Sequence, residues 1–186
     1  MTFTNHKAPT EPIIIPHIQR KRKMNYLGLN KDKTTATVKS LNQLLANYHF
    51  YYQNLRNFHW NIKGQNFFEL HAQFEGLYND ARLKIDEIAE RILTLRHRPL
   101  STISAYADNA EIKEYHRPMQ DRDMMKAILE NHKILIENFR KVLKEAGKAG
   151  DEGTIDMIGG FLETIEKSSW ILEAWTADNT VFDHVW

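Results

Sequence analysis

The chain has 186 residues and a formal net charge of +1. This length suits one domain with a full hydrophobic core, and the near-zero charge excludes a bulk electrostatic attraction of the whole chain to nucleic acid. The absence of cysteine excludes disulfides and thiolate sites and fits a reducing compartment.

The first 33 residues are strongly basic. They carry seven basic and two acidic side chains, a local charge of +5, whereas residues 34–186 have a charge of −4. This asymmetry predicts a basic N-terminal arm on a mildly acidic domain. The longest apolar run in the arm, Ile13–Ile15 between two prolines, is too short for a signal peptide or a membrane span. We therefore expect a cytoplasmic protein with no membrane partner.

Helical periodicity dominates the rest of the chain, without a convincing strand pattern. Apolar residues spaced three or four apart predict a first helix over 34–61, with His59 on its apolar stripe. Asn66 and Glu69 resemble a capping box. They predict the start of a second helix, which ends near His97.

A long connection over 99–119 follows, with a short helix expected over 103–109. The third helix is predicted over 121–146, with a stop at Gly147, and the fourth over 154–177. A connection of that length can carry the chain from one end of a bundle to the other. The predicted fold is therefore all-α: a four-helix bundle with a short helix in its middle crossover and an N-terminal extension.

Polar residues share one face of the second helix, beside its apolar stripe. At about 100° per residue, the face spans roughly 100° and carries His71, Glu75, Asp86 and Glu90. Glu75 and Asp86 are separated by roughly 16 Å of helical rise, whereas metal–ligand distances are about 2 Å. One copy of the helix therefore cannot gather all four side chains around one ion.

Two antiparallel copies could do so. The residue numbers 71 and 90, like 75 and 86, add up to 161. A two-fold axis near residue 80 would thus bring His71 to the partner's Glu90 and Glu75 to the partner's Asp86. His59 could complete each of the two sites. Such nitrogen and oxygen ligands suit iron(II), manganese or zinc, and a bound cation would offset the cost of burying acids.

An ordinary explanation also fits this pattern. A histidine and a glutamate four residues apart are common helix neighbours, and Arg82 could form an i,i+4 ion pair with Asp86. His59 could be a hydrogen-bonded core histidine. The residue pattern alone leaves both explanations open.

The stretch HWNIKG, followed by NFFELH, Glu75 and KIDEIAER, resembles the signature of the Dps family, the DNA-binding proteins from starved cells within the ferritin superfamily. The resemblance covers about residues 34–177. It implies five ferroxidase ligands, with Glu75 in place of the usual Asp: His59, His71, Glu75, Asp86 and Glu90.

The resemblance also implies a function. Members of this family form hollow shells of twelve subunits that oxidise iron(II), preferentially with hydrogen peroxide, and store ferric mineral, which protects DNA from oxidative damage. A two-iron site would lie at the two-fold subunit interface, and zinc or manganese could substitute for iron. Ferritins with a site inside one bundle use Glu-x-x-His motifs. The sequence contains none, which favours the intersubunit type.

Two further regions carry predictions. Asp151, Glu152 and Asp156 lie where the family lines a three-fold iron pore, although acids at a helix start also favour the helix dipole. The basic run is Arg20, Lys21, Arg22 and Lys23, which could neutralise DNA phosphates without reading sequence.

An alternative function is therefore that of a DNA-compacting, nucleoid-associated protein with secondary metal chemistry. A solvated tail would explain the basic residues equally well. The segment EPIIIP, residues 11–16, suggests a docked stretch within the arm.

Overall fold

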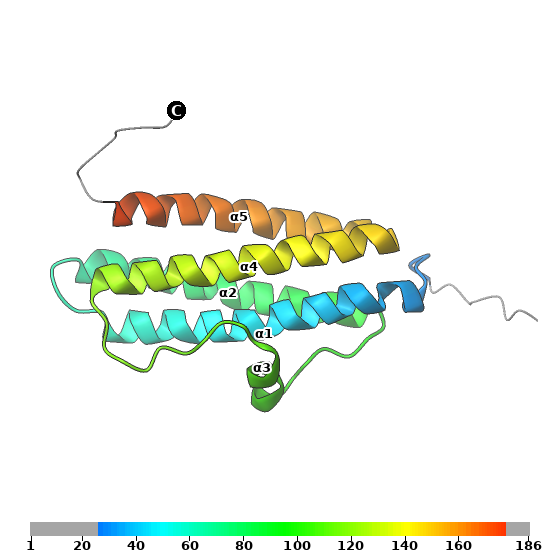
Figure 1. Ribbon diagram of the computed structural model, residues 1–186, viewed down its shortest axis with the longest axis horizontal. Helices are drawn as coiled ribbons and strands as arrows, with labels where there is room; N and C mark the ends of the chain where they lie inside the picture. Colours follow the sequence, from blue (N-terminus) through cyan, green and yellow to red (C-terminus); the bar gives the residue numbers. More distant parts are fainter. Residues whose placement is uncertain (1–25, 178–186) are drawn as a thin grey trace, which may run out of the picture.

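The computed structural model describes residues 26–177, which form five α-helices and no strand (Figure 1). Their bounds are α1 Lys31–Asn61, α2 Phe67–Thr94, α3 Ile103–Asn109, α4 Asp121–Ala149 and α5 Glu152–Thr176. The four long helices lie alongside one another, and the short α3 packs against α1 from the crossover between α2 and α4 (Figure 1). The predicted all-α four-helix bundle with a short crossover helix is confirmed.

The apolar stripes of the long helices form one hydrophobic core. Leu41 and Leu55 of α1, Phe74 and Ile88 of α2 and Phe139 of α4 are completely buried. Each such side chain contributes about 1.5–3 kcal/mol of hydrophobic stabilisation. The helix α1 packs on α2 and α4, and α4 packs on α5, whereas the backbones of α2 and α5 lie further apart and are joined by longer side chains such as Arg91. No helix within residues 26–177 is long and apolar enough to span a membrane.

The first helix begins earlier than predicted. Asn30 caps it, because its side-chain oxygen accepts a hydrogen bond from the Asp32 backbone amide at 2.9 Å. Lys31 and Lys33, which the sequence assigned to the basic arm, therefore belong to α1. The segment EPIIIP and the run Arg20–Lys23 lie outside the described residues.

The predicted capping box at the start of α2 is wrong. The Asn66 side chain makes no capping hydrogen bond; its amide nitrogen donates to the Asp121 carboxylate at 2.7 Å instead. This contact ties the start of α2 to the start of α4. The helix ends at Thr94, before the predicted end near His97.

The turn between α4 and α5 also differs from the prediction. The helix α4 continues through Gly147 to Ala149 and ends at Gly150, whose φ of 67° lies in the left-handed region that favours glycine. Asp151 then caps α5 by accepting a hydrogen bond from the Thr154 amide at 3.1 Å. The helix α5 therefore begins at Glu152, two residues before the predicted start.

Candidate metal centre

Two of the predicted ligands, His59 and His71, lie against each other where α1 ends and α2 begins. Their imidazole rings stack with centroids 3.7 Å apart and planes inclined by 22°. His59 Nδ1 donates to the His71 backbone carbonyl at 2.8 Å, and His71 Nδ1 donates to the His59 carbonyl at 2.9 Å. The short loop between the helices thus brings together two side chains that are twelve residues apart.

These reciprocal hydrogen bonds determine which nitrogen is available for a metal. A carbonyl oxygen can only accept, so each Nδ1 must carry a proton. In a neutral imidazole the other nitrogen, Nε2, then has a free lone pair, which is the form that binds metals. The backbone carbonyls also fix the orientation of both rings, as the outer partners of metal-ligating histidines commonly do.

Aromatic side chains hold the pair in place. The Phe67 ring stacks on His71 with centroids 5.0 Å apart, and the Tyr78 ring meets His59 edge-on at 5.3 Å. His59 is buried, whereas His71 is partly exposed. His59 is therefore a hydrogen-bonded, buried histidine through its Nδ1 atom, as the ordinary explanation suggested. That explanation gives no role to its Nε2 atom.

Three carboxylates complete the predicted set, and all three are exposed on the protomer. Glu75 accepts a long hydrogen bond of 3.4 Å from the Tyr78 hydroxyl. Burial, together with the nearby Glu75 charge, raises the pKa of Tyr78, so this hydroxyl remains a donor at neutral pH. Asp86 and Glu90 have no hydrogen-bond or ion-pair partner for their carboxylates among residues 26–177, so the suggested Arg82–Asp86 pair does not form there.

One protomer does not complete a metal site. Within the described part of the chain, no group of three or more His, Asp and Glu side chains is placed to hold an ion together. The histidine pair and the Asp86–Glu90 pair lie toward opposite ends of α2. A site that uses both pairs therefore needs a second copy of the chain.

Exposed apolar residues lie on the same face of α2 as the acids. Phe68 and Leu93 are 86% and 55% exposed. Taking His71 as zero, they lie at about 60° and 40° around the helix, within the span of the predicted ligands. The two side chains lie roughly 37 Å apart along α2, so they share a direction but form no continuous patch on one protomer.

The predicted pore acids differ in their surroundings. Asp151 is buried, and its carboxylate pairs with Arg91 of α2 and accepts a hydrogen bond from the Thr154 hydroxyl at 2.7 Å. This carboxylate joins α2 to α5 and is not free to line a pore. Glu152 and Asp156 are exposed.

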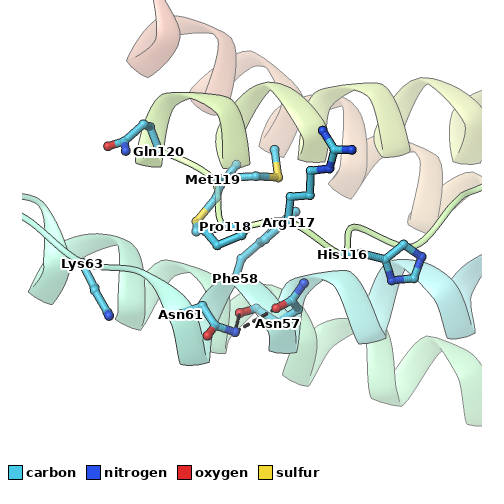
Figure 2. A pocket seen from close by; sticks show the side chains of 10 residues that line it. Asn57, Phe58, Asn61, Lys63, His116, Arg117, Pro118, Met119 and Gln120 are labelled. Carbon is cyan, nitrogen blue, oxygen red and sulfur yellow. Dashed lines mark hydrogen bonds between the residues drawn. The ribbon is translucent and has the colours of Figure 1, made fainter.

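A separate pocket of 340 Å³ lies between the end of α1 and the segment that leads into α4 (Figure 2). Its wall includes Asn57, Asn61, Lys63, His116 and Arg117. None of the five predicted ligands lines it. The pocket therefore has no part in the candidate metal centre.

Sequence reasoning missed the supporting residues. Tyr78 was not identified, although it lies three residues after Glu75, a spacing that places two side chains side by side on a helix. The apolar pair Phe68 and Leu93 was also missed. Their residue numbers add up to 161, like those of the ligand pairs. The same sum therefore identifies them as a pair that could meet across the two-fold axis.

Comparison with known proteins places this chain in a family. The model of the ferritin-like domain matches residues 38–179. The DNA protection during starvation protein of Porphyromonas gingivalis is 42% identical over 155 residues, which cover 83% of this chain and 98% of that protein.

Solved structures give the same result. A Dps protein from Vibrio cholerae O1, described as a member of a broad superfamily of ferritin-like diiron-carboxylate proteins, has a TM-score of 0.80 and 44% identity, covering 83% of this chain and 97% of that one. Dps from Staphylococcus aureus has a TM-score of 0.75 and 34% identity, covering 77% and 96%.

Proposed function

This chain belongs to the Dps family of ferritin-like proteins, and from that premise we propose that it is a ferroxidase that oxidises and stores iron at sites shared between two subunits. Iron(II) is the substrate, and hydrogen peroxide is the preferred oxidant. The observation that carries the proposal is the pair of stacked histidines, whose hydrogen bonds leave both Nε2 atoms free.

The remaining ligands would come from a second copy of α2. In an antiparallel pair, His71 and Glu75 would face the partner's Glu90 and the partner's Asp86. Two features of the protomer support this arrangement. The carboxylates of Asp86 and Glu90 are exposed and lack partners in the described residues. In addition, Phe68 would meet Leu93 of the partner subunit in the same register, which would bury two exposed apolar side chains.

The proposed ligand set suits the reaction. Imidazole nitrogens with carboxylate oxygens form a ligand field that binds iron(II), and the carboxylates compensate the additional positive charge when iron becomes ferric. Two iron(II) ions supply one electron each, and one peroxide with two protons is reduced to two water molecules. Because both electrons pass to one peroxide, a hydroxyl radical is not released.

Glu75 stands where the family usually has Asp. Its side chain is one methylene longer, and its carboxylate accepts a long hydrogen bond from Tyr78, whose ring lies against His59. We expect Glu75 to remain a ligand, since a flexible exposed carboxylate can adjust its reach by changing rotamer.

The assembly proposed for the chain is a hollow shell of twelve subunits, with ferric mineral inside. Glu152 and Asp156, which are exposed near the start of α5, are the acids that would line an iron pore. Zinc or manganese would bind the same ligands without the full reaction.

A second proposed activity is DNA binding by the N-terminal arm. It is supported by the run Arg20–Lys23 and by the local charge of +4 over residues 1–25, which carry five basic and one acidic side chain. Twelve arms on one shell would bind multivalently. Removal of residues 1–25 would weaken binding in a gel-shift assay at low salt and leave iron oxidation unchanged.

The primary test is the double variant His59→Ala/His71→Ala. Mixed anaerobically with iron(II) and then with peroxide, it should oxidise iron at least roughly 100-fold more slowly than the wild type. His116→Ala, a change at an exposed histidine away from the site, is the matched control and should retain the wild-type rate. Equal rates for the double variant and the wild type would overturn the assignment.

A further inference from the structure

The centre of the bundle contains a second group of polar side chains, apart from the histidine pair. They surround a cavity of 270 Å³ to which each of the four long helices contributes. The side chains that matter here are Tyr51 of α1, Asp80 and Lys84 of α2, and His132 of α4. Residues of both α2 and α5, whose backbones lie further apart than those of α1 and α2, line the cavity.

Such a cavity has the chemistry of a metal site. A carboxylate, an imidazole and a phenol oxygen are ligands for divalent first-row metals. Ferritin-like proteins that hold two metal ions within one protomer do so in the bundle core, with ligands that project inward from facing helices. Tyr51, Asp80 and His132 line the cavity from three helices of this bundle, with Asp80 half exposed.

A lysine occupies this position instead. Lys84 is only 5% exposed, and its ammonium group contacts both carboxylate oxygens of Asp80, one helical turn earlier. The ammonium also lies 5.3 Å from the centre of the Phe161 ring of α5, a cation–π arrangement. The Asp80 side chain remains 49% exposed, so the cation is the more deeply buried member of the pair.

Both ring nitrogens of His132, the imidazole that lines the cavity, also have hydrogen-bond partners. Ser169 Oγ donates to the Ile165 carbonyl at 2.7 Å, so it accepts from His132 Nδ1 at 2.8 Å. His132 Nε2 then accepts from the Tyr51 hydroxyl at 2.7 Å. Burial, followed by the positive charge of Lys84, lowers the pKa of His132 to about 3. The Lys84 charge, which contributes to the lowered pKa of His132, repels a divalent cation more strongly than a proton, because repulsion scales with charge.

We propose that Lys84 is the residue that keeps the centre of the bundle closed to divalent metals, so that iron(II) binds at the shared site of His59 and His71. The ammonium group takes the place of the metal, neutralises Asp80 and repels a second cation. This inference rests on the proposed function for the identity of the metal and for the site that remains. The exclusion itself applies to any divalent first-row ion.

The test uses cobalt(II), whose visible absorption reports nitrogen and oxygen ligands, on the assembled full-length protein. The background is His59→Ala/His71→Ala, which removes the shared site. In this background we expect no cobalt band at the bundle centre while Lys84 is present. Lys84→Glu, which adds a carboxylate one turn from Asp80, should bind about one cobalt(II) per chain. Lys84→Met, which keeps the length and removes the charge, should bind at least tenfold more weakly than Lys84→Glu.

Lys144→Glu is the matched control, since it makes the same charge change at an exposed position on α4 and should bind no cobalt. The inference is wrong if the background binds cobalt in the bundle with Lys84 intact. It is also wrong if folded, assembled Lys84→Met binds none, a result that stands even where Lys84→Glu does not fold. Failure of the protein with His59 and His71 intact to bind cobalt would count against the proposed function and leave the role of Lys84 unaffected.

Discussion

Two pairs of charged residues on α2, each with i,i+4 spacing, have opposite surroundings. Asp80 and Lys84 form an ion pair in which the Lys84 side chain is buried and the Asp80 carboxylate is half exposed. Asp86 and Glu90, six residues further along, are two exposed acids. Their carboxylates have no ion-pair partner among the described residues. At about 100° per residue, the centres of the two pairs lie about 120° apart around the helix, so they are on different faces.

Under the two proposals above, this difference would direct a metal away from the bundle centre and toward the face shared by two subunits. Charges that are neutralised within the protomer stabilise the fold and leave no ligand free. Acids left unneutralised repel each other until a cation or a partner arrives, so the fold gains nothing from them. We call the first region the closed centre (Tyr51, Asp80, Lys84 and His132) and the second the open face (His71, Glu75, Asp86 and Glu90).

The largest expected effect is a pH dependence that originates in the closed centre. The pKa of His132 is lowered from 6.5 to about 3. As the pH falls from 6.5 toward 3, the unfolded chain takes up this proton and the folded chain does not, so folding stability is lost over that window, by up to about 5 kcal/mol. Urea unfolding of the iron-free protein at a series of pH values measures this loss. His132→Gln should show a shallower decline; an identical slope would mean that His132 is not a neutral buried group.

A somewhat smaller effect on stability is expected at the ion pair between Arg91 and Asp151. Asp151→Ala would leave Arg91 partly buried without its partner, which costs about 3–5 kcal/mol. Asp156→Ala, an exposed acid on the same helix, should change the free energy of unfolding by no more than about 0.5 kcal/mol. Denaturant unfolding compares the two variants, and similar losses would contradict the distinction between paired and unpaired acids.

The open face can be tested by measuring subunit association in variants of Phe68, which lies on the same side of α2. Phe68 is 86% exposed on the protomer, so Phe68→Asp should leave the helices of one chain intact. If this face joins two subunits, the variant should weaken association at least roughly tenfold. Sedimentation over a range of concentrations, with circular dichroism as the check on helix content, measures both. Phe68→Leu is the control that keeps an apolar side chain, and an unaltered assembly in Phe68→Asp would place the interface elsewhere.

The smallest effect is expected at Glu75. Glu75→Asp shortens a flexible exposed carboxylate by one methylene and restores the residue usual for the family. The rate of iron oxidation should change by less than about fivefold, or about 1 kcal/mol. Glu75→Gln, which removes the charge at the same length, should have the larger effect on the concentration of iron(II) needed for half-maximal rate. A loss of activity in Glu75→Asp as large as in Glu75→Gln would show that the additional methylene is essential.

The sequence predicted the four long helices because their apolar residues recur with the helical period. The predicted end of α4 was wrong because the sequence offers two glycines, Gly147 and Gly150, as the helix end. Only the structure shows that Gly150 is the one with a positive φ. The histidine pair was predicted through the motif, but its reciprocal Nδ1 hydrogen bonds were not, because they depend on the path of the loop between α1 and α2. Lys84 and His132 were missed because their contacts include residues of other helices, and the sequence does not show which helices pack around them.

The central claim is that each metal site is built from two chains, and mixing two inactive variants tests it most directly. One variant is His59→Ala/His71→Ala, and the other is Asp86→Ala/Glu90→Ala. In a mixed pair, the histidines of one chain meet the intact acids of the other at one of the two sites. Random reassembly should therefore restore about a quarter of the wild-type rate of iron oxidation, since half of the pairs are mixed and each has one intact site. A rate that stays at the level of the separate variants would show that the site belongs to a single chain.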